Sequence, residues 1–159
     1  MKEQADNRIH LRFKSIGENV SLARLAVSFM VSRLDLSLAE LDEITVATSE
    51  AVSNAIIHGY RNEPEHMVTL EAELFGDWLR IQVSDEGCGI EDIAQAMEPN
   101  FSKPTFFTGE EQEERMGLGF SFMQSFMDSV DVISTVGEGT SVILSKQLLA
   151  DRNEALPQA

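Results

Sequence analysis

The 159-residue sequence predicts an α/β protein of the α+β kind: a two-layer sandwich with helices on one face of a mostly antiparallel mixed sheet. The order of the expected elements is strand, helix, helix, strand, strand, loop, helix, strand, strand. Each expected helix has one apolar stripe, and short turns separate the later strands, as in hairpins. A doubly wound parallel sheet would need regular strand–helix alternation, which this sequence lacks.

The N-terminal part is expected to supply one strand and two helices. Residues 8–14 alternate apolar and polar side chains, which indicates a strand with one buried face. Residues 18–34 place apolar side chains at helical spacing. Ser37 is a suitable N-cap with a glutamate three residues on, as in a capping box. We expect the second helix to run from there to about His58 and to stop at Gly59, a favoured residue after a helix end.

The C-terminal part is expected to supply two hairpins with a long loop and a helix between them. Two strands are expected over 67–75 and 78–85, and a second hairpin around 137–139. Between them we expect a loop from 87 to about 115, with a lid over 97–116, and a helix over 120–127. A loop of this length in a compact domain is usually functional or disordered. Residues 1–150 are expected to form a single domain, followed by a flexible tail over 151–159.

Charge and cysteine content limit the functional classes. The chain has 12 basic and 27 acidic residues, a formal net charge of −15, which repels nucleic-acid backbones and anionic membranes. This charge would favour a basic protein partner, or it is simply a solvated surface that maintains solubility. The single cysteine, Cys88, excludes an intramolecular disulfide. No signal peptide or long apolar run is present, so we expect a cytoplasmic protein without direct nucleic-acid or membrane binding.

A first candidate site lies near the end of the second helix. Glu50 and Asn54 are four residues apart and therefore share one helical face, and His58 continues the line. Their oxygens suit Mg²⁺ when phosphates and waters complete the coordination, and a glutamate there could instead take a proton from a hydroxyl. The alternative is the polar edge of an ordinary amphipathic helix. His58 alone is expected to be a helix-dipole partner or a structural hydrogen bonder.

Two glycine-containing segments form the other candidates. In 83–90, Asp85 ends a strand, and Gly87 and Gly89 allow a sharp turn close to a ligand; the alternative is a plain turn with an exposed acid. In 114–123, two glycines stand before a helix, whose first amides could bind an anion with help from Arg115; the alternative is a flexible helix entry. The chain contains neither a P-loop nor a dinucleotide-binding fingerprint.

Taken together and in this order, the motifs resemble the GHKL superfamily of ATP-binding domains, the Bergerat fold, which includes histidine kinases. The resemblance rests on the helix with Glu-x-x-x-Asn, the Asp-x-Gly-x-Gly turn, the lid-like loop, the Gly-x-Gly helix start and the segment "VGEGT", and it covers about residues 8–148. Within the superfamily, "SEAVSNAIIHGY", "DEGCGI" and "FMQSFMDSVDV" resemble the short anti-sigma factors that are serine-protein kinases. The sporulation anti-sigma F family is most similar, and the stress-response anti-sigma B family is the alternative.

The resemblance implies roles for individual residues. It implies that Asn54 coordinates Mg²⁺ at the phosphates, that Asp85 binds the adenine amino group, that Glu50 is the general base and that Arg115 lies near the terminal phosphate. The cofactors would be ATP or ADP with Mg²⁺. The implied nucleotide-binding residues are Asn54, Asp85, Gly87, Gly89, Gly117, Leu118, Gly119, Phe120 and Thr140.

The resemblance also implies partners. Arg24 would lie on a protein-binding surface, although an exposed helix arginine without a partner is the alternative. The expected partners are a sigma factor, sigma F by resemblance, and an anti-anti-sigma protein of the STAS type whose serine is phosphorylated; the chain itself would be a homodimer. The competing hypotheses are a non-catalytic module that senses ATP or ADP, an anti-sigma B-type kinase, and an ATPase fragment of a larger sensor. The segment 104–114 is longer than the resemblance leads us to expect.

Overall fold

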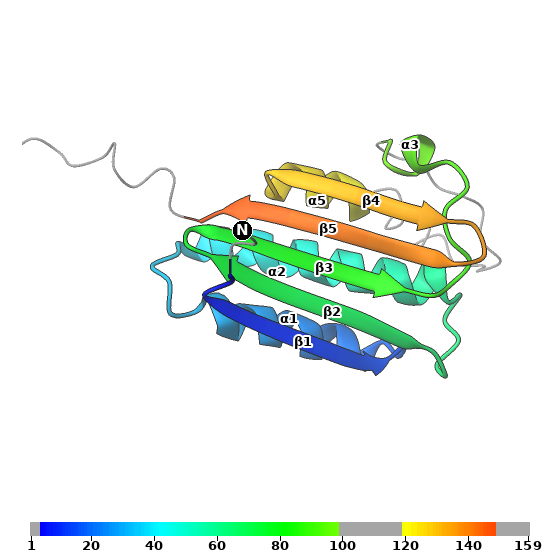
Figure 1. Ribbon diagram of the computed structural model, residues 1–159, viewed down its shortest axis with the longest axis horizontal. Helices are drawn as coiled ribbons and strands as arrows, with labels where there is room; N and C mark the ends of the chain where they lie inside the picture. The colour runs from blue at the N-terminus through cyan, green and yellow to red at the C-terminus, as the bar shows by residue number, and fades with distance from the viewer. Residues whose placement is uncertain (1–3, 99–118, 149–159) are drawn as a thin grey trace, which may run out of the picture.

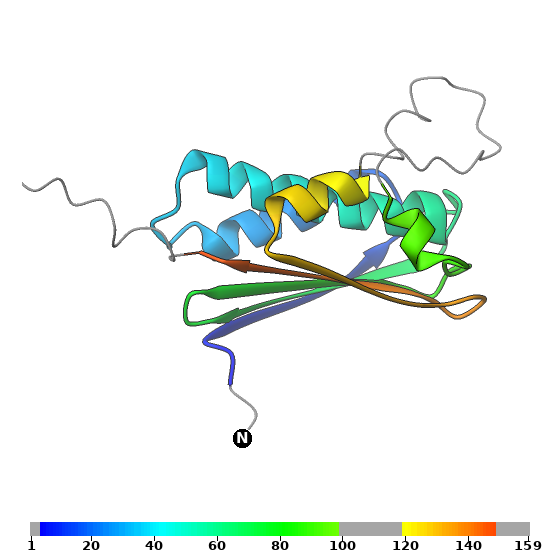
Figure 2. The ribbon, with the colours of Figure 1, turned by 90° about the horizontal axis from the view of Figure 1, so that it is seen from above.

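The computed structural model describes residues 4–98 and 119–148. Within these residues, a sheet forms one layer and the helices α1, α2 and α5 cover one of its faces (Figures 1 and 2). The elements in chain order are β1 (Asn7–Lys14), α1 (Glu18–Val31), α2 (Leu38–Asn54), the π-helical turn η1 (Ala55–Gly59), β2 (Met67–Phe75), β3 (Trp78–Asp85), α3 (Ile93–Ala96), α5 (Gly119–Phe126), β4 (Ser129–Thr135) and β5 (Gly139–Gln147).

The five strands follow the order β1-β2-β3-β5-β4, and every neighbouring pair in this described sheet is antiparallel. The predicted two-layer sandwich is therefore confirmed, while the parallel pair that a mixed sheet would contain is not found among the described strands. The connection that matters for the site is the pairing of β3 with β5, which sets Asp85 opposite Thr140. The carboxylate-bearing end of β3 and the β4–β5 turn consequently meet at one end of the sheet.

The core lies between the sheet and the helix layer. Alternate side chains of each strand point toward the helices, as the period of two requires. Leu70, Ile81 and Leu144 show this pattern on β2, β3 and β5, and all three are fully buried. Full burial of such a side chain stabilises a fold by about 1.5–3 kcal/mol. Helix α2 lies between α1 and α5 and contacts both, so its position depends on the whole layer.

Helix α2 begins with the predicted capping box. The Ser37 side chain accepts a hydrogen bond from the Glu40 amide, and the Glu40 carboxylate accepts one from the Ser37 amide. The helix was expected to run to about His58 and to stop at Gly59; α2 instead ends at Asn54, and the wider turn η1 carries the chain on to Gly59. A π turn is held by bonds between residues five apart, and the sequence has no simple signal for it.

The remaining elements agree closely with the expected ranges. Strands over 67–75 and 78–85 are present as predicted, and α5 begins one residue earlier than expected, at Gly119. The short helix α3 lies inside the segment predicted as a loop. The expected lid falls almost wholly outside the described residues, and the C-terminal tail lies outside them. No helix in the described part of the chain is long and apolar enough to cross a membrane.

Candidate nucleotide-binding site

Glu50 and Asn54 lie one turn apart in the last part of α2, and both side chains are half-buried. Their neighbours Ala51 and Val52 are buried in the core, which fixes the helix, while the polar pair faces the start of α5. The backbone changes from α to π geometry directly after Asn54. Turns with π geometry are frequent at functional sites.

The start of α5 lies against this pair. A Cβ atom added at Gly119 would be 2.9 Å from Glu50 Oε2 and 3.4 Å from Asn54 Oδ1. Because real Cβ atoms almost never approach other atoms within 3.0 Å, a glycine permits this close approach without displacement of the glutamate. The structure therefore brings together Glu50, Asn54 and Gly119, three residues that are far apart in the sequence.

Helix α5 also contains an unsatisfied polar group. Ser121, in the first turn of the helix, has a buried Oγ with no hydrogen-bond partner among the described residues. Buried hydroxyls are nearly always hydrogen-bonded, so an orphaned one indicates a missing partner such as a water or a ligand. Together with the amides at the helix start, this hydroxyl suits an anionic group. A phosphate-bearing ligand fits the residues present.

Asp85 ends β3 and lies beside the π turn. Burial raises the pKa of the Asp85 carboxyl above its ordinary value, while hydrogen bonds from the backbone amides of Gly87 and Thr140 act in the opposite direction. The Gly87 amide donates to Asp85 Oδ1 at 2.9 Å. A Cβ atom at Gly59 would be 2.7 Å from the Asp85 carboxyl carbon, so the last residue of η1 contacts the carboxylate directly.

The loop after Asp85 depends on close backbone contacts. A Cβ atom at Gly87 would be 2.1 Å from the Gly59 carbonyl oxygen, a distance that only displacement of the backbone could relieve. Gly89 has a positive φ of 74°, a conformation that side chains rarely adopt. The Cys88 amide donates to the Gly59 carbonyl at 3.0 Å. These contacts hold the loop against the end of the helix that carries Asn54.

Ser134 is a residue of this site that the sequence analysis did not identify. Its hydroxyl accepts from the Ile90 amide at 2.7 Å and donates to the Gly139 carbonyl at 3.1 Å, and it lies 2.8 Å from Thr140 Oγ1. It thereby connects the glycine loop to the β4–β5 hairpin. A signal was available, because strand alternation places Ser134 on the same face as Val130 and Val132, where an apolar residue would be expected.

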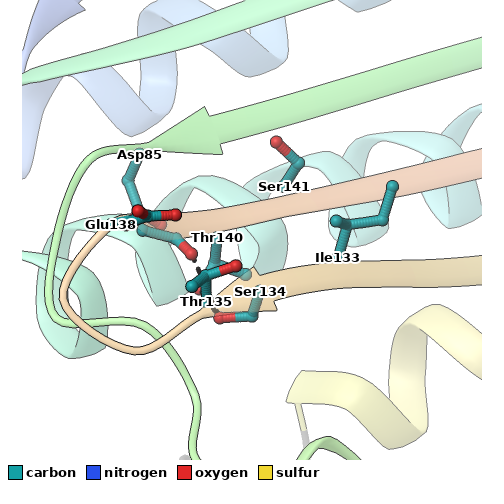
Figure 3. A pocket seen from close by; sticks show the side chains of 8 residues that line it. Asp85, Ile133, Ser134, Thr135, Glu138, Thr140 and Ser141 are labelled. Carbon is teal, nitrogen blue, oxygen red and sulfur yellow. Dashed lines mark hydrogen bonds between the residues drawn. The ribbon is translucent and has the colours of Figure 1, made fainter.

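A shallow open pocket of about 200 Å³ lies at this end of the sheet (Figure 3). Asp85 stands at the end of β3, next to the turn that joins β4 and β5. The lining is largely polar, with carboxylates and hydroxyls that can exchange hydrogen bonds with a ligand. The lining residues are Asp85, Ile133, Ser134, Thr135, Glu138, Gly139, Thr140 and Ser141.

The sequence suggested that His58 is a helix-dipole partner or a structural hydrogen bonder. Burial lowers the pKa of the His58 imidazole and so disfavours the charged ring that a dipole partner needs. The Cys88 thiol donates to the His58 carbonyl at 3.1 Å, so the backbone of His58 supports the glycine loop. His58 consequently contributes to the scaffold behind the site rather than to its charge.

The other predicted site residues divide into two groups. Phe120, in the first turn of α5, is half-buried and packs against the core, and Arg24 is exposed on α1. Three lie outside the described residues: Arg115, Gly117 and Leu118. The described residues contain no group of three or more histidine, cysteine or acidic side chains that could hold a metal by themselves.

The fold and this site define the chain as an ATP-binding domain of the histidine kinase-like class. The Histidine kinase-like ATPase domain family matches residues 13–146, which is most of the chain. Two solved structures are similar in fold. The structure of the RsbU and RsbW domains of a Mycobacterium tuberculosis protein has a TM-score of 0.61 and 18% sequence identity, and the match covers 89% of this chain and 32% of that chain. A blue-light activated histidine kinase of Erythrobacter litoralis is also similar (TM-score 0.55, 21% identity, 86% and 43%).

Sequence relatives specify the family further. The anti-sigma F factor of Oceanobacillus iheyensis is 46% identical over 89% of this chain and 93% of the relative. Those of Clostridium beijerinckii and Clostridium acetobutylicum are 41% and 44% identical over 90% and 89% of this chain, and over 96% and 94% of the relatives. The chain therefore belongs to the anti-sigma F factor family, as the motif resemblance indicated.

Proposed function

We propose that this chain is a cytoplasmic ATP-dependent protein kinase of a single domain, residues 1–150, that also binds and inhibits a sporulation sigma factor. Its phosphotransfer substrate would be a serine of an anti-anti-sigma protein of the STAS type. The family membership supports the ATP-dependent, sigma-directed part of this proposal. The observation that carries the catalytic part is the position of Glu50, one turn from Asn54 and directly beneath the start of α5.

The base of the nucleotide would bind at the Asp85 end of the site. An ionised carboxylate accepts hydrogen bonds only, which suits an exocyclic amine such as that of adenine. The amides of Gly87 and Thr140 hold the Asp85 carboxylate in place. Gly89 lies in the loop beside the carboxylate, and Thr140 lies in the neighbouring strand, where its hydroxyl contacts Ser134. The acidic net charge of the chain does not prevent binding, because charges beyond about 8–10 Å are screened at physiological salt.

The phosphates would bind between Asn54 and the first turn of α5. Backbone amides there, with Gly117, Leu118, Gly119 and Phe120 as the proposed contributors, would neutralise phosphate charge, and Arg115 would add a cation. The amide oxygen of Asn54 would hold Mg²⁺, which takes its remaining ligands from phosphate and water. The metal would offset charge on the transferred group. The buried hydroxyl of Ser121 is a further candidate donor on this side.

Glu50 would act on the protein substrate. A carboxylate near the terminal phosphate can accept the proton of a serine hydroxyl and orient its oxygen for in-line attack. Phosphoryl transfer depends mainly on positioning and charge neutralisation, and a preformed site meets both needs. A non-catalytic nucleotide sensor, the alternative, would need Asn54 and Asp85 but would have no need of a carboxylate at Glu50.

Arg24 would contribute to the protein-binding surface. It is exposed on α1, so a partner can reach it without any change in the fold. The net charge of −15 supports a basic partner, because opposite charges increase the rate of encounter. We propose that the basic partner is a sigma factor, and family membership favours sigma F.

The proposed homodimer is supported by an apolar stripe on α1 formed by Leu22, Leu25 and Phe29. These side chains are 48%, 64% and 74% exposed and point away from the core. Glu18 begins α1 and Arg33 follows its end. An antiparallel pairing of two α1 helices, centred between residues 25 and 26, would place Leu22 against Phe29 and Glu18 against Arg33 of the second copy. This twofold pattern of charge and apolar contact favours a second copy as the occupant.

A nucleotide-dependent pull-down tests the proposal. The chain is immobilised and incubated with sporulating-cell extract or purified sigma and STAS-type proteins, without nucleotide and with ATP or ADP, and retained proteins are mapped for phosphoserine. We expect retention of a sigma factor and ATP-dependent phosphorylation of a serine on the STAS-type protein. Retention without any phosphorylation would favour the nucleotide sensor, and Arg24→Ala should reduce retention while ATP binding stays intact.

A further inference from the structure

Tyr60 carries a pair of hydrogen bonds that no role described so far requires. Its side chain is 5% exposed, and its hydroxyl donates to the Met67 carbonyl at 2.6 Å and accepts from the Glu86 amide at 2.7 Å. Burial raises the pKa of the Tyr60 phenol, so the hydroxyl keeps its proton and can donate as well as accept at neutral pH. The ring is fixed by stacking on His66, with centroids 4.6 Å apart.

These bonds join the two ends of the proposed nucleotide site. The Tyr60 amide donates to the Ala55 carbonyl at 2.9 Å, which closes the π turn that follows Asn54. The Tyr60 hydroxyl holds the Glu86 amide, which is the peptide group directly after Asp85. One residue thereby connects the helix end that would hold the phosphates to the carboxylate that would hold the base.

We infer that Tyr60 is a positioning residue that fixes the direction of the Asp85 carboxylate and thereby the selectivity of the site for an adenine nucleotide. The inference rests on the proposed function, because it needs a nucleotide at this site. Anchoring the peptide after Asp85 limits rotation of the backbone that carries the carboxylate. Binding groups must be held within about 0.5 Å of the productive geometry by their supporting contacts.

The chain offers a matched control in Ser15. Its side chain is buried, donates to the Glu63 carbonyl at 2.6 Å and accepts from the His66 amide at 3.2 Å. The Ser15 hydroxyl thus satisfies one carbonyl and one amide, as the Tyr60 hydroxyl does, but it connects the end of β1 to the segment before β2. Removing either hydroxyl leaves two buried backbone groups unpaired, so the two variants should lose comparable stability.

The experiment compares Tyr60→Phe and Ser15→Ala with the unchanged chain. Affinities for ATP and GTP, each with Mg²⁺, are measured by calorimetry, and thermal unfolding is followed by circular dichroism. We expect Tyr60→Phe to weaken ATP binding about tenfold, as the loss of buried hydrogen bonds implies, and to lower the ATP-to-GTP affinity ratio. Ser15→Ala should lower the unfolding temperature to a similar extent without changing the affinity ratio.

A second measurement does not depend on how well the variant folds. Tyr60 is the single tyrosine of the chain, so growth with 3-fluorotyrosine places one fluorine label at this position alone. We expect its fluorine resonance to shift when ATP with Mg²⁺ is added and to shift less with GTP. The label leaves the hydroxyl and the ring in place.

The outcomes separate this inference from the proposed function. An unchanged chain that binds no ATP would overturn both. If the unchanged chain binds ATP but Tyr60→Phe keeps its affinity and selectivity, the role of Tyr60 alone is wrong. Equal losses of selectivity in Tyr60→Phe and Ser15→Ala would likewise overturn it, because they would reflect general destabilisation. If the chain binds ATP but the fluorine resonance does not respond to it, the role assigned to Tyr60 is also wrong.

Discussion

Gly119 lies directly against Glu50: a methyl group in place of its hydrogen would be 2.9 Å from the Glu50 carboxylate oxygen Oε2. The first turn of α5 and the last turns of α2 are therefore in contact at the residues to which we assign phosphate binding and proton transfer. A side chain at position 119 would displace the Glu50 carboxylate, so the position of Glu50 is sensitive to a small change on the neighbouring helix.

The role of Glu50 can be tested by Glu50→Gln. The amide keeps the size of the side chain but cannot accept a proton, so we expect ATP affinity to stay close to that of the unchanged chain. Phosphorylation of the STAS-type substrate should fall by about 10²–10⁴-fold, the usual contribution of a general base. Radiolabelled phosphate transfer and calorimetry measure the two quantities separately. Transfer at an unchanged rate would contradict the assigned role.

The contact between the two helices can be tested by Gly119→Ala. Alanine favours helix, which offsets the crowding, so we expect an unfolding temperature close to that of the unchanged chain. The added methyl group should displace the Glu50 carboxylate and reduce phosphotransfer about tenfold. Gly17→Ala is the matched control, because a Cβ atom there meets nothing within 4 Å. Equal phosphotransfer activity in both variants would show that the contact between Gly119 and Glu50 does not affect catalysis.

The raised pKa of Asp85 predicts how nucleotide binding depends on pH. Only the ionised carboxylate accepts the proposed hydrogen bond from the base, so ATP affinity should fall as the pH is lowered. Because burial raises this pKa, the fall should begin at a higher pH than an ordinary aspartate would give. Calorimetric titrations at a series of pH values measure this. Affinity that stays constant through the mildly acidic range would argue against Asp85 as the acceptor.

The same shift predicts opposite effects of Asp85→Asn on stability and binding. A carboxyl whose pKa is higher in the folded than in the unfolded state stabilises the fold below its unfolded pKa, and this stability is lost as pH rises through the folded pKa. At pH 7 the charged, partly buried group is therefore unfavourable. Asp85→Asn should unfold at the same or a higher temperature than the unchanged chain, yet bind ATP about tenfold or more weakly. A large loss of stability would indicate that Asp85 has a structural role instead.

The apolar stripe on α1 predicts how the chain associates. Phe29→Glu places a charge within the apolar stripe, opposite Leu22 of the second copy in the proposed pairing, so sedimentation should change from dimer to monomer. The side chain is 74% exposed, so the unfolding temperature of the monomer unit should change little. Val136→Glu makes the same change at another exposed apolar position, 64% exposed, and should leave the dimer intact. A Phe29→Glu variant that remains dimeric would place the dimer contact elsewhere.

The sequence by itself determined the layers and the chemical components of the site. Strand alternation, helical spacing and the Ser37 capping box predicted the elements because these signals are local, and one face of each element must be buried. The motifs around Asn54, Asp85 and Gly119 predicted a nucleotide site because their types and order resemble those of a known family of ATP-binding domains. Such signals can be read from the sequence without knowing which residues lie close together in space.

Only the tertiary structure decided how these residues meet. The approach of Gly119 to Glu50, and of Gly59 to Asp85, depends on the packing of α5 and η1 against α2 and β3, which no local pattern encodes. The π turn after Asn54 is local but has no simple sequence signal. The hydroxyls of Ser134 and Tyr60 act on the amides of Ile90 and Glu86, which are distant in the chain, so their roles follow from the packing. Burial likewise raised the pKa of Asp85 and lowered that of His58, because desolvation is a property of the packed molecule.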